Sequence, residues 1–221
     1  MHRAALLLLS FCSCAALAQP ASVDADAFRS EAASQYRKVL AGLAAKGKLD
    51  DDAALLGRVR PIAARLIIAA AQVRPDTSAW DWEVHVTSDP SRGAFCMAGG
   101  KLMVGGALVR GLDLDDAELA MLLGHEIAHA VADHRRAPAR DTMSSDPAAE
   151  LREVEIAVRQ ESEADRIGMD LAHRAGWSAS RLAGFFDKLA AAQSPGTFNS
   201  SHPSAAARAA VAKELARRIG D

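Results

Sequence analysis

The chain has 221 residues, half of them hydrophobic, and a formal net charge of −2 at pH 7. This length and composition are sufficient for one domain with a substantial hydrophobic core. The near-balance of charge excludes a strongly basic surface of the kind that binds nucleic acid, so we expect no nucleic-acid partner.

The first eighteen residues have the pattern of a cleaved export signal. The basic start Met1-His2-Arg3 precedes an uncharged apolar run over residues 4–17, and Ala16-Leu17-Ala18 matches the small-x-small pattern of a signal-peptidase site. The run is shorter than the ~20 apolar residues that a membrane-spanning helix needs. We therefore expect residues 1–18 to be removed, leaving residues 19–221 as a single periplasmic domain without a transmembrane segment.

The cysteines bear on anchoring and on stability. An alternative to signal cleavage without a lipid is attachment of a lipid anchor at Cys14 or Cys12. However, Phe11-Cys12-Ser13 is a poor match to the Leu-small-small pattern that precedes a lipoprotein cysteine. Cys96 is then alone in the mature chain, so no internal disulfide can form. Because it lies in an apolar, strand-like stretch, Cys96 is predicted to be a buried small hydrophobe rather than a nucleophile.

Periodicity and capping residues predict a mainly helical domain of the α+β class. The predicted helices span about residues 28–43, 50–73 (with Pro61 as a kink or break), 115–134, 148–175, 178–193 and 204–219. The helix over 115–134 has the clearest start, because Asp115 followed by Glu118 forms a capping box. Residues 135–147 and 194–203 are predicted to be loops.

Three short segments are predicted to be strands. Residues 82–86 alternate in polarity, and the apolar runs 94–97 and 101–104 flank Ala98-Gly99-Gly100, which fits a β-hairpin. We expect a small antiparallel sheet of about three strands beside the helix over 115–134.

The most informative motif is His125-Glu126-Ile127-Ala128-His129. On a helix, residues i and i+4 share a face, so both imidazoles can bind one metal ion. Glu126 lies next to the first ligand, where a carboxylate can take a proton from the attacking water. The alternative is a buried helix with two incidental histidines.

A catalytic zinc ion needs three protein ligands and an open position. His129 is not followed by the glycine and third histidine of the metzincin extension, so the candidates are carboxylates on the helix over 148–175. Glu161 is the best of these, and Asp165 one turn later can hydrogen-bond a ligand's free ring nitrogen. The remaining glutamates of that helix are predicted to form a solvated face: Glu150, Glu153, Glu155 and Glu163.

With these motifs in order, the chain resembles the M48 zinc metallopeptidases, which include bacterial periplasmic quality-control proteases. The resemblance covers about residues 58–215 and is carried by four stretches: residues 94–101, 116–129, 161–168 and 201–208. It implies a zincin-like fold, one zinc ion held by His125, His129 and Glu161, Glu126 as catalytic base, and Asp165 as the partner of a ligand.

The oxyanion of the tetrahedral intermediate also needs a donor. His202 and Arg208 are the candidates, and His202 is alternatively a fourth zinc ligand or a loop histidine without a chemical role. Tyr36 is discounted because it lies in the N-terminal helix, far before the motif. His134 and His173 are predicted to be structural or exposed.

Two hypotheses about function follow. The first is a zinc-dependent endopeptidase that hydrolyses peptide bonds in unfolded or misfolded exported proteins. The alternative is a latent or chaperone-like binding module whose zinc only stabilises the fold. Under the first, an extended polypeptide adds a strand at residues 94–97 or 101–104, the loop over 135–147 covers the cleft, and association with the outer membrane or its assembly machinery is a further expectation.

Overall fold

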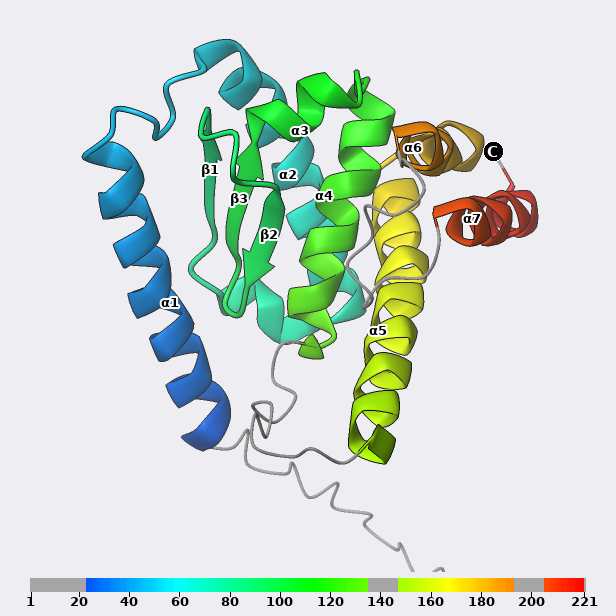
Figure 1. Cartoon of the computed structure of the whole chain (residues 1–221), viewed down its shortest axis with the longest axis horizontal. Coiled ribbons are helices and arrows are strands. Elements are labelled where there is room, and N and C mark those ends of the chain that lie inside the picture. The colour runs from blue at the N-terminus through cyan, green and yellow to red at the C-terminus, as the bar shows by residue number, and fades with distance from the viewer. Residues whose placement is uncertain (1–22, 135–146, 193–204, 221) are drawn as a thin grey trace, which may run out of the picture.

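The computed structural model describes residues 23–134, 147–192 and 205–220, so the predicted export signal and most of both predicted loops lie outside the described residues. Two helices and a 3-10 turn precede three consecutive strands, and only helices follow (Figure 1). In chain order the elements are α1 Val23–Ala44, α2 Ala53–Val73, the 3-10 turn η1 Pro75–Ala79, β1 Glu83–Thr87, β2 Ala94–Met97, β3 Lys101–Gly105, α3 Gly106–Gly111, α4 Asp116–Val131, α5 Pro147–Arg174, α6 Ala179–Ala192 and α7 Ala205–Ile219.

The predicted helices are present, and their capping residues explain where they start. The Asp115 side chain accepts from the backbone of Ala117 and Glu118, while Glu118 accepts from the backbone N–H of Asp115, so the capping box of α4 is formed. α4 ends at Val131 rather than at His134. Pro61 lies inside α2 without breaking it, and the short helix α3 was not predicted.

The sheet differs from the prediction, because it is mixed rather than antiparallel. The strand order is β1-β3-β2: β2 pairs antiparallel with β3 as the predicted hairpin, but β1 pairs parallel with β3. Residues 88–93 carry the chain past β3, which places β2 on the far edge and leaves β3 in the centre. Residues 101–104 therefore have both edges paired, so the alternative in which a substrate strand adds to residues 101–104 was wrong.

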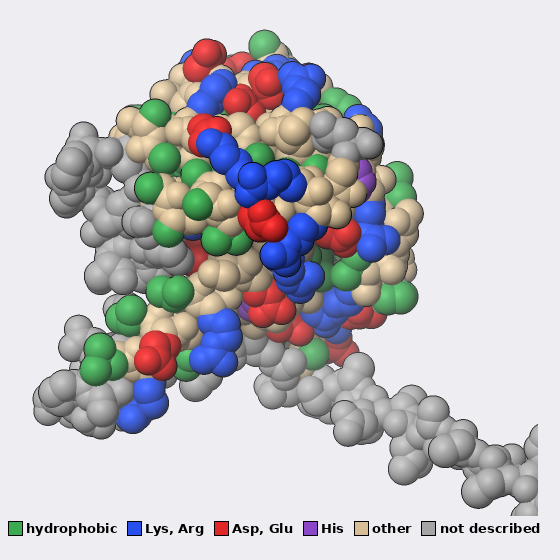
Figure 2. All heavy atoms as spheres, turned by 90° about the vertical axis from the view of Figure 1, so that its right-hand side faces the viewer, with side chains coloured by type: hydrophobic (Ala, Val, Ile, Leu, Met, Phe, Trp, Pro, Cys, Tyr) green, Lys and Arg blue, Asp and Glu red, His purple; other side chains and the backbone are tan. Residues whose placement is uncertain are grey.

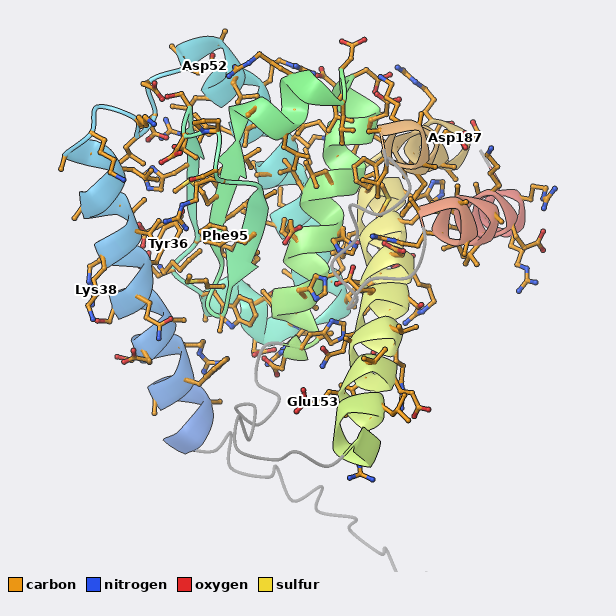
Figure 3. The ribbon with its side chains drawn as sticks, in the orientation of Figure 1. Tyr36, Lys38, Asp52, Phe95, Glu153 and Asp187 are labelled. Carbon is orange, nitrogen blue, oxygen red and sulfur yellow. The ribbon has the colours of Figure 1, made fainter. Side chains whose placement is uncertain are left out.

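The two faces of the sheet pack into different cores. Met103 of β3 lies with Tyr36 and Leu43 of α1, whereas Leu102 and Val104 join the larger core formed with α2, α4, α5 and α6. This alternation follows from the two-residue period of a strand. In Figure 3, Tyr36 and Phe95 point toward one another between α1 and the sheet, and their rings meet edge to face at 6.2 Å.

α4 is the central helix of the structure. It lies between the sheet and α5, with α2 behind it and α6 and α7 beyond α5 (Figure 1). Every residue from Ala117 to Val131 is buried. A helix that is surrounded on all sides holds its side chains in fixed directions, so any site built on α4 has a rigid support.

The outer helices present a mixed polar surface. Figure 2 shows basic and acidic side chains interleaved on the face that carries α7, and several are paired, such as Lys213 with Asp187 and Arg218 with Glu214. In the part of the chain that the structure describes, we find no helix that combines the length and the apolarity needed to cross a membrane.

α4 and α5 pack tightly against one another at a pair of glycines. A Cβ atom on Gly124 would lie 2.6 Å from the carbonyl oxygen of Gly168, and one on Gly168 would lie 2.6 Å from the backbone nitrogen of His125. These distances are too short for any side chain, so the two backbones are in direct contact. His125 is next in sequence to this contact, and Glu161 lies two turns along α5 from it.

Substituting Gly168→Ala is expected to force the two helices apart and to destabilise the fold by about 1–3 kcal/mol, the usual cost of overpacking a tight contact. The measurement is chemical denaturation. Gly57→Ala is the matched control, because Gly57 is exposed on α2 and an added Cβ would meet nothing within 4 Å. That control should be neutral or more stable by up to about 1 kcal/mol. Equal stability of Gly168→Ala and the parent would contradict the role assigned to the contact.

Candidate metal centre

Two imidazoles from α4 and one carboxylate from α5 converge on a common point. The Nε2 atoms of His125 and His129 are 3.1 Å apart. The Glu161 carboxylate approaches both rings, with Oε2 3.4 Å from Nε2 of His125 and Oε1 3.3 Å from Nε2 of His129. The fold thus brings together the three residues that the sequence predicts as metal ligands.

The spacing of these three residues fits a metal ion. Bonds of ~2.1 Å arranged as a tetrahedron place neighbouring ligand atoms ~3.4 Å apart, which agrees with the three distances above. The side chains are also buried, since His125, His129 and Glu161 are 7%, 8% and 7% exposed. In the described residues this is the one group of at least three His, Cys, Asp or Glu side chains with such spacing. Two imidazole nitrogens and a carboxylate can therefore hold a divalent cation here.

Asp165 fixes the orientation of His125. Its Oδ1 lies 2.9 Å from Nδ1 of His125, the ring nitrogen that faces away from the convergence point. Glu161 and Asp165 are one turn apart on α5, as the sequence predicts, so one helix face supplies both the candidate ligand and the partner of a ligand. A carboxylate at this position holds the proton on Nδ1 and leaves Nε2 as the ligating atom.

Arg208 of α7 binds Asp165 rather than pointing into open space. Its Nε and Nη2 donate to Oδ2 and Oδ1 of Asp165 at 2.8 and 2.6 Å, and its guanidinium lies 5.5 Å over the ring of Phe186. The remaining nitrogen, Nη1, is 3.6 Å from Oε2 of Glu161. The structure thus shows Arg208 as a support for Asp165, while its action on an oxyanion stays a prediction.

The charges around the site are strongly coupled. Burial by itself would lower the pKa of His125, but hydrogen bonds to Asp165 and Glu161 and the charge of Glu126 raise it to about 9. Burial would likewise raise the pKa of Asp165, yet its contacts with His125 and Arg208 hold that pKa below the usual range. In the metal-free protein, His125 is therefore protonated at neutral pH.

Glu126 lies in the same buried environment. It is 9% exposed, and its charge contributes to the raised pKa of both His125 and Arg208. A buried carboxylate beside a metal site has the position that a general base requires. Its catalytic role stays a prediction, which its burial and its place next to His125 favour.

His134 and Glu163 join the site, which the sequence did not indicate. His134 was predicted to be structural or exposed; it is buried, at 7% exposed, and its Nδ1 lies 3.1 Å from Nδ1 of His129. Its Nε2 lies 3.3 Å from Oε2 of Glu163, whose side chain is 47% exposed; Glu163 thus lies on the solvated face of α5, as predicted, and also contacts His134. The spacing carries no signal for this contact, because residues two positions apart on a helix, such as Glu161 and Glu163, do not share a face.

Other predicted residues lie away from the site or outside the described residues. Tyr36 is fully buried against the opposite side of the sheet and donates to the Leu102 carbonyl at 2.6 Å. Cys96 is fully buried, as predicted. His202 and the loop over 135–146 lie outside the described residues, so their predicted roles stay predictions.

The model of peptidase family M48 matches residues 55–146 and 147–216 of this chain. These ranges make up most of the sequence and include α4, α5 and most of α7. The chain belongs to peptidase family M48. Family M48 membership agrees with the resemblance seen in the sequence and with a predominantly helical fold that carries a buried His-His-Glu cluster.

Two curated relatives are similar over a shorter part of this M48 chain. The mitochondrial metalloendopeptidase OMA1 of Arabidopsis thaliana is 45% identical over 53 residues, which cover 24% of this chain and 11% of that protein. The mitochondrial metalloendopeptidase OMA1 of Bos taurus is 38% identical over 68 residues, which cover 31% of this chain and 13% of that protein. The chain thus matches only a small fraction of the length of either relative.

Metal binding by this M48 centre is expected to release protons. Because His125 has a pKa of about 9 in the metal-free protein, a metal ion must displace its proton at pH 7. Titration calorimetry with Zn²⁺ in buffers of different ionisation enthalpy should report about one proton released per ion. Zinc affinity should rise as the pH increases from 6 toward 9. An affinity independent of pH over this range would contradict the charge coupling described above.

Proposed function

We propose that this M48 protein is a zinc-dependent endopeptidase that cleaves unfolded or misfolded exported polypeptides in the periplasm. The observation that carries the proposal is the convergence of His125, His129 and Glu161 with Glu126 buried beside them. A purely structural zinc site has no need of an adjacent base and is usually closed by a fourth protein ligand.

The residues of the site divide the chemistry between them. His125, His129 and Glu161 would hold the ion, which when bound acts as a Lewis acid on the scissile carbonyl and the attacking water. The Glu126 carboxylate takes a proton from that water and returns it to the leaving nitrogen. Asp165, held by Arg208, keeps His125 in the tautomer and orientation that ligation needs.

The edge strand β2 offers a place where an extended polypeptide substrate could bind. In the described sheet β2 pairs with β3 along one side, and it packs beside α4. A polypeptide that adds to this edge would lie along the metal centre and bind through its backbone. Such pairing selects chains that are already extended more than it selects a sequence, which suits unfolded substrates.

The periplasmic location is supported by the leader of the sequence. The relatives are named as mitochondrial proteins. Mitochondrial transit peptides are amphipathic and rich in arginine, whereas residues 4–17 are uncharged and apolar, as in a secretory signal. Processing is therefore expected near Ala18, and association with the outer membrane or its assembly machinery belongs to the same proposal.

A Glu126→Gln variant tests the proposed chemistry. It should fold, bind one zinc ion per chain and lose cleavage of casein by at least about 100-fold, because general base catalysis of this kind contributes 10²–10⁴-fold. Glu155→Gln is the matched control, since Glu155 is exposed on α5. That control should cleave as the parent does, and a chelator should abolish cleavage by both.

Two outcomes would contradict the proposal. Casein cleavage by Glu126→Gln at the rate of the parent would remove Glu126 from the mechanism. A parent that binds zinc and suppresses aggregation of an unfolded protein without cutting it would instead favour the chaperone-like alternative.

A further inference from the structure

The two candidate histidine ligands use different partners for their second ring nitrogen. His125 faces the carboxylate of Asp165, whereas His129 faces another imidazole, that of His134. The rings of His129 and His134 meet edge to face, with centroids 5.0 Å apart and planes at 76°. This geometry directs the Nδ1 atoms of the two rings at one another over 3.1 Å.

The direction of this hydrogen bond follows from ligation. When Nε2 of His129 binds a metal ion, the proton of the neutral ring must be on Nδ1, which then donates. Nδ1 of His134 must accept, so the proton of His134 is on Nε2. That atom faces Oε2 of Glu163 at 3.3 Å, which is an acceptor. The contacts therefore define one consistent chain, from His129 to His134 to Glu163.

We propose that His134 is a positioning residue for the metal centre, which holds the ring of His129 as an acceptor and is itself oriented by Glu163. The proposal rests on the proposed metal site, because it concerns how one of the three ligands is kept in place. It assigns a role to each acidic residue of the α5 motif: Glu161 reaches the convergence point, Asp165 holds His125, and Glu163 holds His129 through His134.

The backbone after α4 explains how His134 reaches His129. On a continued helix, a residue five positions on would point ~140° away from His129. α4 instead ends at Val131, and Asp133 adopts a left-handed conformation with φ of 56°. Arg74 secures this turn, because its Nη1 donates to the Val131 carbonyl at 2.7 Å and to Asp133 at 2.9 Å.

A further contact ties the turn to α5. The side chain of Gln160 donates to the backbone carbonyl of His134 at 3.1 Å. His134 is thus held by its backbone and by its ring to the helix that supplies Glu161. Both ring nitrogens of His134 have partners, as a buried imidazole requires, and one of these partners is the candidate ligand His129.

The test compares zinc binding of His134→Ala and His134→Asn in the full chain, by competition with a chelator. His134→Ala should lower zinc affinity by about 10- to 100-fold, the usual cost of losing the partner of a ligand. His134→Asn should restore affinity to within about threefold of the parent, because the asparagine Oδ1 can accept where Nδ1 does. With Co²⁺ in place of zinc, the absorption spectrum of His134→Ala should shift and that of His134→Asn should match the parent.

Glu163→Ala gives an independent measurement, with Glu155→Ala as the control on the exposed part of the same helix. Glu163→Ala should lower zinc affinity, and Glu155→Ala should not. If His134→Ala does not fold, the comparison of His134→Asn and Glu163→Ala with the parent decides the question. A folded His134→Ala that binds zinc within threefold of the parent, or a His134→Asn variant no better than His134→Ala, would overturn the proposal.

The test of the His134 role measures zinc binding, whereas the test of the proposed function measures casein cleavage. The two proposals can therefore fail independently. A parent that binds zinc but does not cleave casein would contradict the proposed function and leave the zinc comparison intact. Cleavage by the parent together with unchanged zinc affinity in His134→Ala would contradict only the positioning role.

Discussion

The direct backbone contact between Gly124 of α4 and Gly168 of α5 is the constraint on which the site depends. The metal-binding groups come from two helices that are separated in sequence, and each side chain has a fixed reach. An added methyl group at this crossing would push the helices apart and move the Glu161 carboxylate relative to the two imidazoles. The glycine contact thus brings the metal-binding residues of two sequence motifs together in one cluster.

Several ionised side chains are buried around this contact, and the fold pairs them with opposite charges. Glu126, Glu161 and Asp165 are carboxylates in a space where uncompensated ions are costly. In the metal-free protein, Arg208 and the protonated ring of His125 supply the opposing charge. A bound cation would take over part of that role, so metal binding and the protonation state of the cluster are linked.

The periphery of the molecule supports the same centre from several directions. The capping box at Asp115 sets the start of α4, and Lys188 of α6 binds Glu118 of that box at 2.7 Å. On the other side of α4, the sheet places β2 beside the helix while α1 seals the far face through Tyr36. These supports account for a helix that is buried from Ala117 to Val131 and still carries polar residues.

The sequence alone determined the long helices, the capping box of α4, the hairpin and the three candidate ligands, because each depends on neighbours within a few positions or on a motif with known spacing. It did not indicate the short helix α3. It also determined the family, through four stretches in the right order. Only the tertiary structure decided the strand order, since pairing of β1 with β3 depends on where residues 88–93 cross. Only the structure placed Arg208 on Asp165 and His134 on His129, because the first needs α7 to pack on α5 and the second needs a left-handed turn at Asp133. The local sequence pattern cannot encode such contacts. They arise when packing brings together segments that are distant in sequence, or when the chain turns back after the end of a helix.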